Sequence, residues 1–283
     1  MPRTQSRHGT TLIELIVSLA LLVIVSGIGA IAASRTLTTQ ARAAMLDSRA
    51  SAISDALRTL ARHAGDAEPA RNDIRAARDS VMDIVHPIGI TSVCRSNADT
   101  IITAASADSI PWSAALPRAI TTDDDLRIWH DAQQSWIQRS VRSVTSATGA
   151  CGDSTTAFPG RAWQRVVLTD TSSAIRIGAV VRVLQRERWS LTRGGDGAWA
   201  LSMATWDASR ATFNIPQPLV APLAAPTAAG GPGFAVRAIN SAGAIVADSA
   251  LATTRSLIAV LRAPRHALYG TVTDSVRINV GTH

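Results

Sequence analysis

The chain has 283 residues, of which 46% are hydrophobic and 17% charged. This composition supports a packed core and excludes global disorder, and the length allows one large domain or two modest ones. The formal net charge is +7, and all 28 basic residues are arginine. Because the arginines are spread along the chain without a run of four, we interpret them as solvated surface; a nucleic-acid partner is not expected.

The amino-terminal segment divides into a polar, basic stretch at 1–9 and an apolar run at 12–33. As a helix the run rises about 33 Å, enough to cross a hydrocarbon core of about 30 Å. Its one charged residue is Glu14. An ionised carboxylate costs about 2–3 kcal/mol at the bilayer centre and less near the interface. An acid in such a run is therefore a functional candidate that needs a partner.

Residues 9–17, with the sequence GTTLIELIV, resemble the signal sequence of type IV prepilins, in which a glycine is followed by F-T-L-I-E-L. Five consecutive residues, TLIEL, match, and Thr10 stands where the family usually has phenylalanine. The resemblance implies that prepilin peptidase cuts after Gly9 and methylates the new amino terminus at Thr10. It also implies that Glu14 pairs with the amino-terminal ammonium of a neighbouring subunit, and such a partner makes a buried carboxylate tolerable.

Two other interpretations of this segment stay open. A secretory signal peptide has a shorter apolar region without an acid, but its small-residue cleavage site could be supplied by Ala30, Ala32 and Ala33. A plain transmembrane anchor would use the apolar run only as a tether. In every case Arg3 and Arg7 precede the span and place the amino terminus in the cytoplasm.

The helical pattern continues beyond the apolar run. Apolar residues from Leu37 to Leu60 recur at spacings of three, four and seven, while arginine and aspartate take other faces. No proline interrupts this pattern, and Gly65 can act as a C-cap. We therefore predict a helix from about Thr11 to about His63, about 80 Å long. Its first half enters the membrane and its second half packs on a soluble domain.

The remainder of the chain has the sequence pattern of an antiparallel β domain, in which short β-rich runs alternate with turn residues. Hairpin turns are expected at 194–197 and 240–243, and a proline- and glycine-rich loop, exposed and mobile, at 216–232. The fold class is α+β, with the long helix packed on the sheet. Strands are expected at 81–85, 100–104, 126–129, 165–169, 175–184, 188–192, 199–204, 234–239, 244–247, 256–261 and 275–280.

The order of a long helix followed by a large β domain is similar to the larger minor subunits of the family, the J-type pseudopilin of type II secretion and the W-type minor pilin. Residues 256–261 and 274–279 lie where the later strands of those proteins would fall. The resemblance implies a leader at 1–9, a membrane and assembly half of the helix at 10–34, an amphipathic half at 35–64 and a periplasmic β domain at 65–283.

Few residues point to other chemistry. Cys94 and Cys151 fit no metal motif; they form either a disulfide, which needs an oxidising compartment, or two buried free thiols. Asp123, Asp124 and Asp125 could hold calcium, although capping of a helix before residue 126 is the commoner use of such a run. The six histidines form no metal motif, and no nucleophile or phosphate-loop motif is present. We expect no enzyme activity, no cofactor and no other metal.

These observations predict a minor pilin or pseudopilin of a type IV pilus or type II secretion system, near the fibre tip because a fibre body repeats small subunits closely. Its expected partners are other pilin or pseudopilin subunits, prepilin peptidase, an inner-membrane assembly platform and the membrane. The expected location is the bacterial inner membrane, with the β domain periplasmic. The main alternative is a membrane-anchored periplasmic binding module or enzyme that uses the helix as a tether; DNA uptake is a third.

Overall fold

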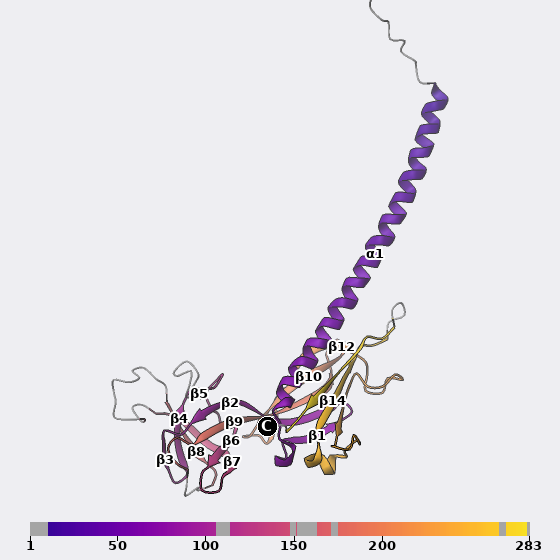
Figure 1. Ribbon diagram of the computed structural model, residues 1–283. Coiled ribbons are helices and arrows are strands. Elements are labelled where there is room, and N and C mark those ends of the chain that lie inside the picture. Colours follow the sequence, from indigo (N-terminus) through magenta and orange to yellow (C-terminus); the bar gives the residue numbers. More distant parts are fainter. Residues whose placement is uncertain are drawn as a thin grey trace, which may run out of the picture. The chain divides into compact units, whose positions relative to one another are not determined.

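The computed structural model describes residues 11–105, 114–147, 151, 163–170, 175–265 and 270–281. It confirms the α+β class, with one long amino-terminal helix and a large antiparallel β domain (Figure 1). The chain divides into two compact units, Met1–Ser51 and Ala52–His283. The last turns of the helix therefore belong to the same unit as the β domain.

Helix α1 runs from Leu12 to Gly65, close to the predicted bounds. Its buried residues, which recur every three or four positions, are Ile53, Ala56, Leu57, Leu60 and Ala64. Within the β-domain unit the packed face of the helix therefore begins at Ile53; packing of residues 35–51 stays a prediction. Leu37 and Met45 belong to the predicted apolar pattern but are exposed, because they lie in the part of α1 outside the β-domain unit.

The described residues after α1 form two sheets and two short 3-10 helices, η1 and η3. The bounds are η1 Pro69–Arg71, β1 Ile74–Arg78, β2 Val81–Ser92, β3 Arg95–Asn97, β4 Thr100–Ala104, β5 Ala114–Ala115, β6 Asp125–His130, β7 Ser135–Ala147, β8 Trp163–Leu168, β9 Val180–Arg193, β10 Trp199–Asp207, β11 Thr212–Phe213, β12 Gln217–Leu223, β13 Phe234–Ile239, η3 Asp248–Thr253, β14 Ser256–Arg262 and β15 Thr273–Asn279.

Strand β9 organises the larger sheet, whose order is β1-β2-β9-β6-β7-β8-β4-β3. Strand β2 pairs with β9 along nearly its whole length. The other edge of β9 pairs first with β6, at residues 181–184, and then with β10, at residues 187–193. The neighbour of β9 therefore changes just before Glu187. Strands β13, β14 and β15 form a separate three-stranded sheet.

Two hydrophobic cores lie along this sheet. The first joins the end of α1 to residues such as Trp189 and Leu191 of β9 and to the three-stranded sheet. The second surrounds Val181 and Val183 of β9 together with side chains of β4, β6, β7 and β8. The alternating burial along β9 follows from the two-residue period of a strand, which points successive side chains to opposite faces.

Several predicted strands are confirmed, including the hairpin of β9 and β10 across 194–197. The runs at 175–184 and 188–192 belong to a single strand, β9, which starts at Val180. Residues 244–247 form no strand: beyond the turn at 240–243 only an isolated bridge joins Ile239 to Ile245. The asparagine side chain at 240 folds this segment locally by accepting hydrogen bonds from the backbone of Ala242 and Ala244.

The prediction of a mobile loop at 216–232 was wrong for its first half. Strand β12 occupies residues 217–223 and pairs with β10 through a register containing two irregularities. Proline cannot donate to a strand ladder but is tolerated at a sheet edge, and β12 is such an edge because it pairs with β10 alone. The proline content of this segment therefore marks an edge strand.

Candidate functional site

The predicted leader cleavage and methylation residues, Gly9 and Thr10, lie outside the described residues. Glu14 lies exposed in the first turn of α1, three residues after Thr11. Its Oε2 accepts hydrogen bonds from the Thr11 backbone N–H at 3.1 Å and from the Thr11 hydroxyl at 3.3 Å, and the Thr11 Oγ1 accepts from the Glu14 N–H at 3.4 Å. This reciprocal pattern is a capping box.

The capping box gives Glu14 a local role that the sequence reasoning missed. The signal was the Thr11-x-x-Glu14 spacing itself, which begins many helices. An acid in the first turn is also favoured by the helix dipole. The presence of Glu14 at the start of the apolar run is therefore compatible both with pairing to another subunit and with an ordinary helix start.

The apolar run that follows is exposed along its length, including Leu12, Ile16 and Ile24. Among the described residues, α1 is the one helix long and apolar enough to cross a membrane. A signal sequence or a core helix passes the same test of length and composition, but here the apolar window is not buried in the protein. The amino-terminal half of α1 could therefore span a membrane.

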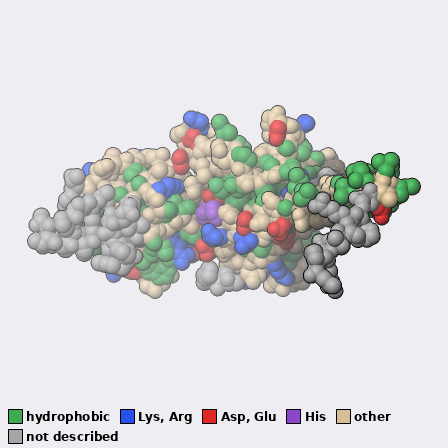
Figure 2. All heavy atoms as spheres, turned by 90° about the horizontal axis from the view of Figure 1, so that it is seen from above, with side chains coloured by type: hydrophobic (Ala, Val, Ile, Leu, Met, Phe, Trp, Pro, Cys, Tyr) green, Lys and Arg blue, Asp and Glu red, His purple; other side chains and the backbone are tan. Residues whose placement is uncertain are grey.

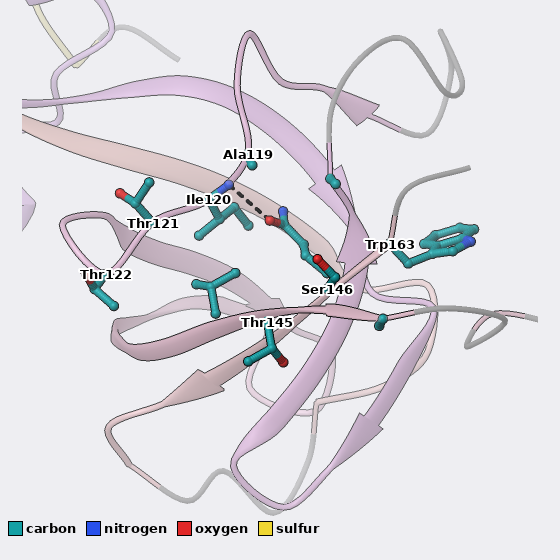
Figure 3. A pocket seen from close by; sticks show the side chains of 11 residues that line it. Ala119, Ile120, Thr121, Thr122, Thr145, Ser146 and Trp163 are labelled. Carbon is teal, nitrogen blue, oxygen red and sulfur yellow. Dashed lines mark hydrogen bonds between the residues drawn. The ribbon is translucent and has the colours of Figure 1, made fainter. Parts of the chain in front are cut away.

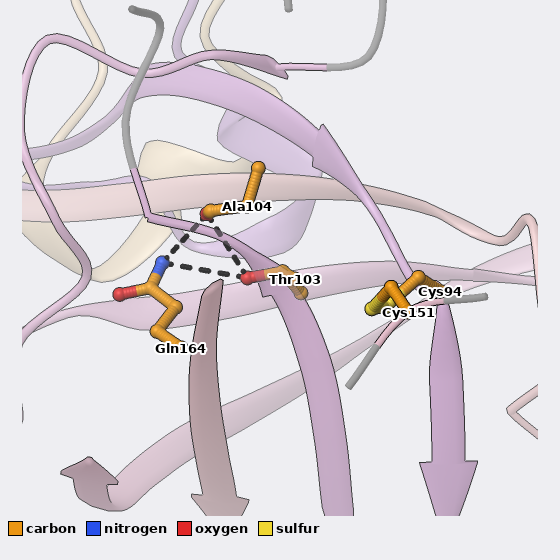
Figure 4. The surroundings of a disulfide bond; sticks show 5 residues. All are labelled: Cys94, Thr103, Ala104, Cys151 and Gln164. Atoms are coloured by element: carbon orange, nitrogen blue, oxygen red, sulfur yellow. Dashed lines mark hydrogen bonds between the residues drawn. A yellow bond between two sulfur atoms is a disulfide. The ribbon is translucent and has the colours of Figure 1, made fainter. Parts of the chain in front are cut away.

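Cys94 and Cys151 are joined by a disulfide, with their Cα atoms 5.6 Å apart, within the range for such bonds (Figure 4). Cys94 follows β2, and its backbone N–H donates to the Ile102 carbonyl of β4. The disulfide closes a loop whose ends are 57 residues apart, which contains strands β3 to β7. The pairing fits an oxidising compartment.

The three aspartates proposed for calcium are not brought together. Asp124 is buried and makes a bidentate ion pair with Arg118, at 2.7 Å to each oxygen. Asp123 accepts from the Ala208 backbone N–H, and Asp125 accepts from Gln138 and Ser140. Asp125 begins strand β6, so the alternative of helix capping at this point was wrong.

A different group of potential ligands converges from three segments that are distant in sequence. His63 comes from the last turn of α1, His86 from β2 and Glu187 from β9. His63 Nδ1 lies 2.8 Å from Glu187 Oε2, and His86 Nε2 lies 3.1 Å from Glu187 Oε1. We call these three residues the His-Glu-His cluster. Their ligand atoms all lie within 4.8 Å of one another.

The His-Glu-His cluster lies on one face of the β2–β9 pair. Ile84 is directly opposite Glu187 in the register, and His86 is two residues further along the same face. The side chains of Arg186 and Arg188 alternate to the other face, where both pair with Asp83. The end of α1 therefore supplies His63 to the face that Glu187 shares with His86.

Electrostatically, the cluster holds an ionised carboxylate. Burial pushes the pKa of Glu187 up, but the two imidazoles at its oxygens more than offset this effect and lower the pKa to about 2. The rings of His63 and His86 are 4.5 Å apart at a tilt of 32°, and the edge of Trp189 meets His63 at 5.7 Å. Trp189 is fully buried, so one wall of the cluster is apolar.

Sequence reasoning could not find the cluster. Its members are separated by 23 and 101 positions, so no local spacing marks them. Only the pairing of β2 with β9 and the packing of the end of α1 bring them together. The sequence carried one weak signal, a histidine in the last turn of a predicted helix, and that position is also favoured by the helix dipole.

A cavity of about 570 Å³ lies between β7, β8 and the segment before β6, and its lining includes Ile120, Thr121, Thr145 and Trp163 (Figure 3). The buried polar group at its wall, Gln164, is fully engaged. Its Oε1 accepts from the Ile120 N–H, and its Nε2 donates to Thr103 and Ala104. Because this amide is already satisfied, none of the described lining residues offers a buried polar group that awaits a ligand.

The surface charges do not gather into a single basic patch on the face seen in Figure 2, where arginine and acidic side chains are interspersed. Several arginines are paired with acids, as in the Arg237–Asp79 contact at 2.6 Å and the Arg71–Glu68 contact at 2.7 Å.

No protein-family model, curated protein or solved structure matches the chain. The class that the structure itself defines is an α+β protein whose amino-terminal helix is long and apolar enough to span a membrane.

Proposed function

We propose that the chain is a type IV pilin-like subunit, a minor pilin or pseudopilin that is cut after Gly9 and methylated at Thr10. The observation that carries the proposal is the GTTLIEL motif at 9–15, placed at the start of an apolar helix. In this proposal the helix leaves the inner membrane for a bundle of similar helices, while the β domain lies in the periplasm. Glu14 then meets the amino-terminal ammonium of a neighbouring subunit.

The length of α1 supports this function over a simple tether. Its 54 residues rise about 81 Å, of which a bilayer core needs about 30 Å. The disulfide fits the proposed periplasmic location. The size of the β domain favours a place near the fibre tip, where a bulky subunit need not repeat.

The decisive experiment follows processing and incorporation in cells that carry a prepilin peptidase. Gly9→Arg should leave an uncut precursor, whereas the parent should yield a mature chain with methylated Thr10 by mass spectrometry. Gly29→Ala, a glycine substitution inside the helix and away from the cleavage site, should be processed normally. Normal cleavage of the Gly9→Arg variant would contradict the proposal.

A second arm separates assembly from tethering. Glu14→Ala should be cut normally but should be lost from sheared fibres or from cross-linked pseudopilin complexes. If Glu14→Ala enters these assemblies as well as the parent, the carboxylate has no assembly role, and the tether interpretation is favoured.

A further inference from the structure

We propose that the His-Glu-His cluster binds one divalent transition metal ion, with Zn²⁺ as the best fit. The metal would join the end of α1 to strands β2 and β9. This inference does not depend on the proposed pilin function, because all three ligands lie in the unit Ala52–His283.

The donor set matches the chemistry of zinc. Zn²⁺ in proteins is bound by imidazole nitrogen and carboxylate oxygen, and two imidazoles with one carboxylate form a known three-ligand set. His63 Nδ1 and His86 Nε2 each offer a lone pair in the neutral tautomer that carries its proton on the other ring nitrogen. Glu187 supplies the negative charge that a buried cation needs.

The spacing also fits. Bonds of about 2.0–2.1 Å place tetrahedral ligand atoms about 3.3 Å apart. The contacts from Glu187 to His63 and to His86 are 2.8 Å and 3.1 Å and use different carboxylate oxygens. Taking one ligand atom from each residue, the three atoms lie within 4.8 Å of one another, so the side chains must close by up to about 1.5 Å to coordinate one ion. The three segments that supply the ligands are fixed by core packing and strand pairing, which limits the rearrangement that binding requires.

An independent observation is the state of His86. Its Nε2 is buried and lies 3.1 Å from Glu187 Oε1, but it has no hydrogen-bond partner among the described residues. A metal ion at the cluster would bind this nitrogen through its lone pair. The contact with the Glu187 carboxylate does not give the nitrogen a hydrogen-bond partner.

The site has a route for entry and an open position. The His63 side chain is 24% exposed, whereas those of His86 and Glu187 are 8% and 3% exposed. A metal can therefore arrive from the His63 side, and water can complete its coordination there. Three protein ligands with one open position is the pattern of sites that exchange their fourth ligand.

The test uses the full-length chain in detergent micelles, stripped with a chelator and desalted. Titration with ZnCl₂ against a chromophoric chelator should show one tight site per chain. At 100 times its dissociation constant, Zn²⁺ should raise the thermal unfolding midpoint by about 5–10 °C. Co²⁺ should give the intense visible absorption of four-coordinate geometry.

The variants identify the site. His63→Gln, His86→Gln and Glu187→Gln should each weaken Zn²⁺ binding by about 100-fold or more and abolish the Co²⁺ absorption. His130→Gln is the matched control, because His130 is also buried, in β6, but lies outside the cluster. His63 is partly exposed, so its substitution keeps the test valid even where the two buried variants fail to fold.

Any of three results would overturn the proposal. The first is the absence of a 1:1 site in the parent protein. The second is retention of tight binding in a folded His63→Gln variant, and the third is an equal loss of binding in His130→Gln. The cluster would then be a metal-free hydrogen-bonded contact between the helix and the sheet.

Discussion

The two parts of helix α1 differ in whether their apolar side chains are buried in the core of the chain. Between Leu12 and Ile31, thirteen large hydrophobic side chains are each more than half exposed. From Ile53 to Ala64, the apolar side chains at every third or fourth position are buried in the core of the β-domain unit. One continuous helix therefore has apolar side chains that are buried in the core near its end and apolar side chains that are exposed near its start.

This difference shows what each part depends on. Burying a large apolar side chain contributes at least about 1.5 kcal/mol, so the thirteen exposed residues forgo on the order of 20 kcal/mol in water. Lipid or the helices of other subunits can supply this stabilisation. The core of the β-domain unit, by contrast, includes the apolar side chains of the end of α1. Substitutions should therefore act on separate properties in the two parts.

The largest expected effect is at Arg127, whose guanidinium is buried and pairs with both oxygens of Asp73, at 2.7 and 3.2 Å. Arg127→Met should lower the free energy of unfolding of the β-domain unit by about 3–5 kcal/mol, since it leaves the Asp73 carboxylate buried without a counterion. Chemical denaturation of the full chain in detergent measures this change.

The matched control is Arg142→Met, because Arg142 is exposed and its contact with Asp99 is 3.9 Å. It should change the stability by less than about 1 kcal/mol. Removing both partners, with Arg127→Met and Asp73→Leu together, should recover much of the loss. Equal effects of the two arginine substitutions would mean that the buried pair is not a determinant of this unit.

The next largest effect on stability is expected for a leucine in the buried part of α1, compared with a leucine in the exposed part. Leu60→Ala should destabilise the β-domain unit by about 3 kcal/mol, because Leu60 is fully buried in the first core. Leu22→Ala should leave its unfolding unchanged, because Leu22 is exposed. A loss of stability with Leu22→Ala comparable to that with Leu60→Ala would contradict the separation of the two parts.

The sequence predicted local elements well and distant contacts poorly. The bounds of α1 and the β9–β10 hairpin were predictable because periodicity and turn glycines are local signals. The order of strands around β9 was not predictable, since pairing between β2 and β9 joins residues about 100 positions apart. The His-Glu-His cluster depends on that pairing, and so it was beyond sequence reasoning.

Packing of α1 is expected from residue 35 and is observed from Ile53, within the β-domain unit. Leu37 and Met45 fit the apolar spacing of a packed helix, but spacing shows only that a helix face is apolar. It does not say whether the same chain covers that face. In a protein whose helix is proposed to pack on other subunits, an apolar face outside the chain's own core is a candidate for intermolecular contact.

The smallest expected energetic effect is at Glu14. Substitutions at this position distinguish a role in helix capping from a role in assembly. Glu14→Ala removes the acceptor for the Thr11 N–H and should lower the protection of the first-turn amides by about 1 kcal/mol in hydrogen exchange. Glu14→Gln keeps an acceptor in the capping box. It should therefore lower the protection of the first-turn amides by only a few tenths of a kcal/mol.

Assembly should respond differently, because an amide cannot offer the charge that pairs with a neighbouring ammonium. If Glu14 acts between subunits, Glu14→Gln should be lost from the fibre as severely as Glu14→Ala, although its helix start is intact. If Glu14 acts only as a cap, Glu14→Gln should assemble like the parent. Neither variant should shift the unfolding of the β-domain unit, because Glu14 lies in the other compact unit.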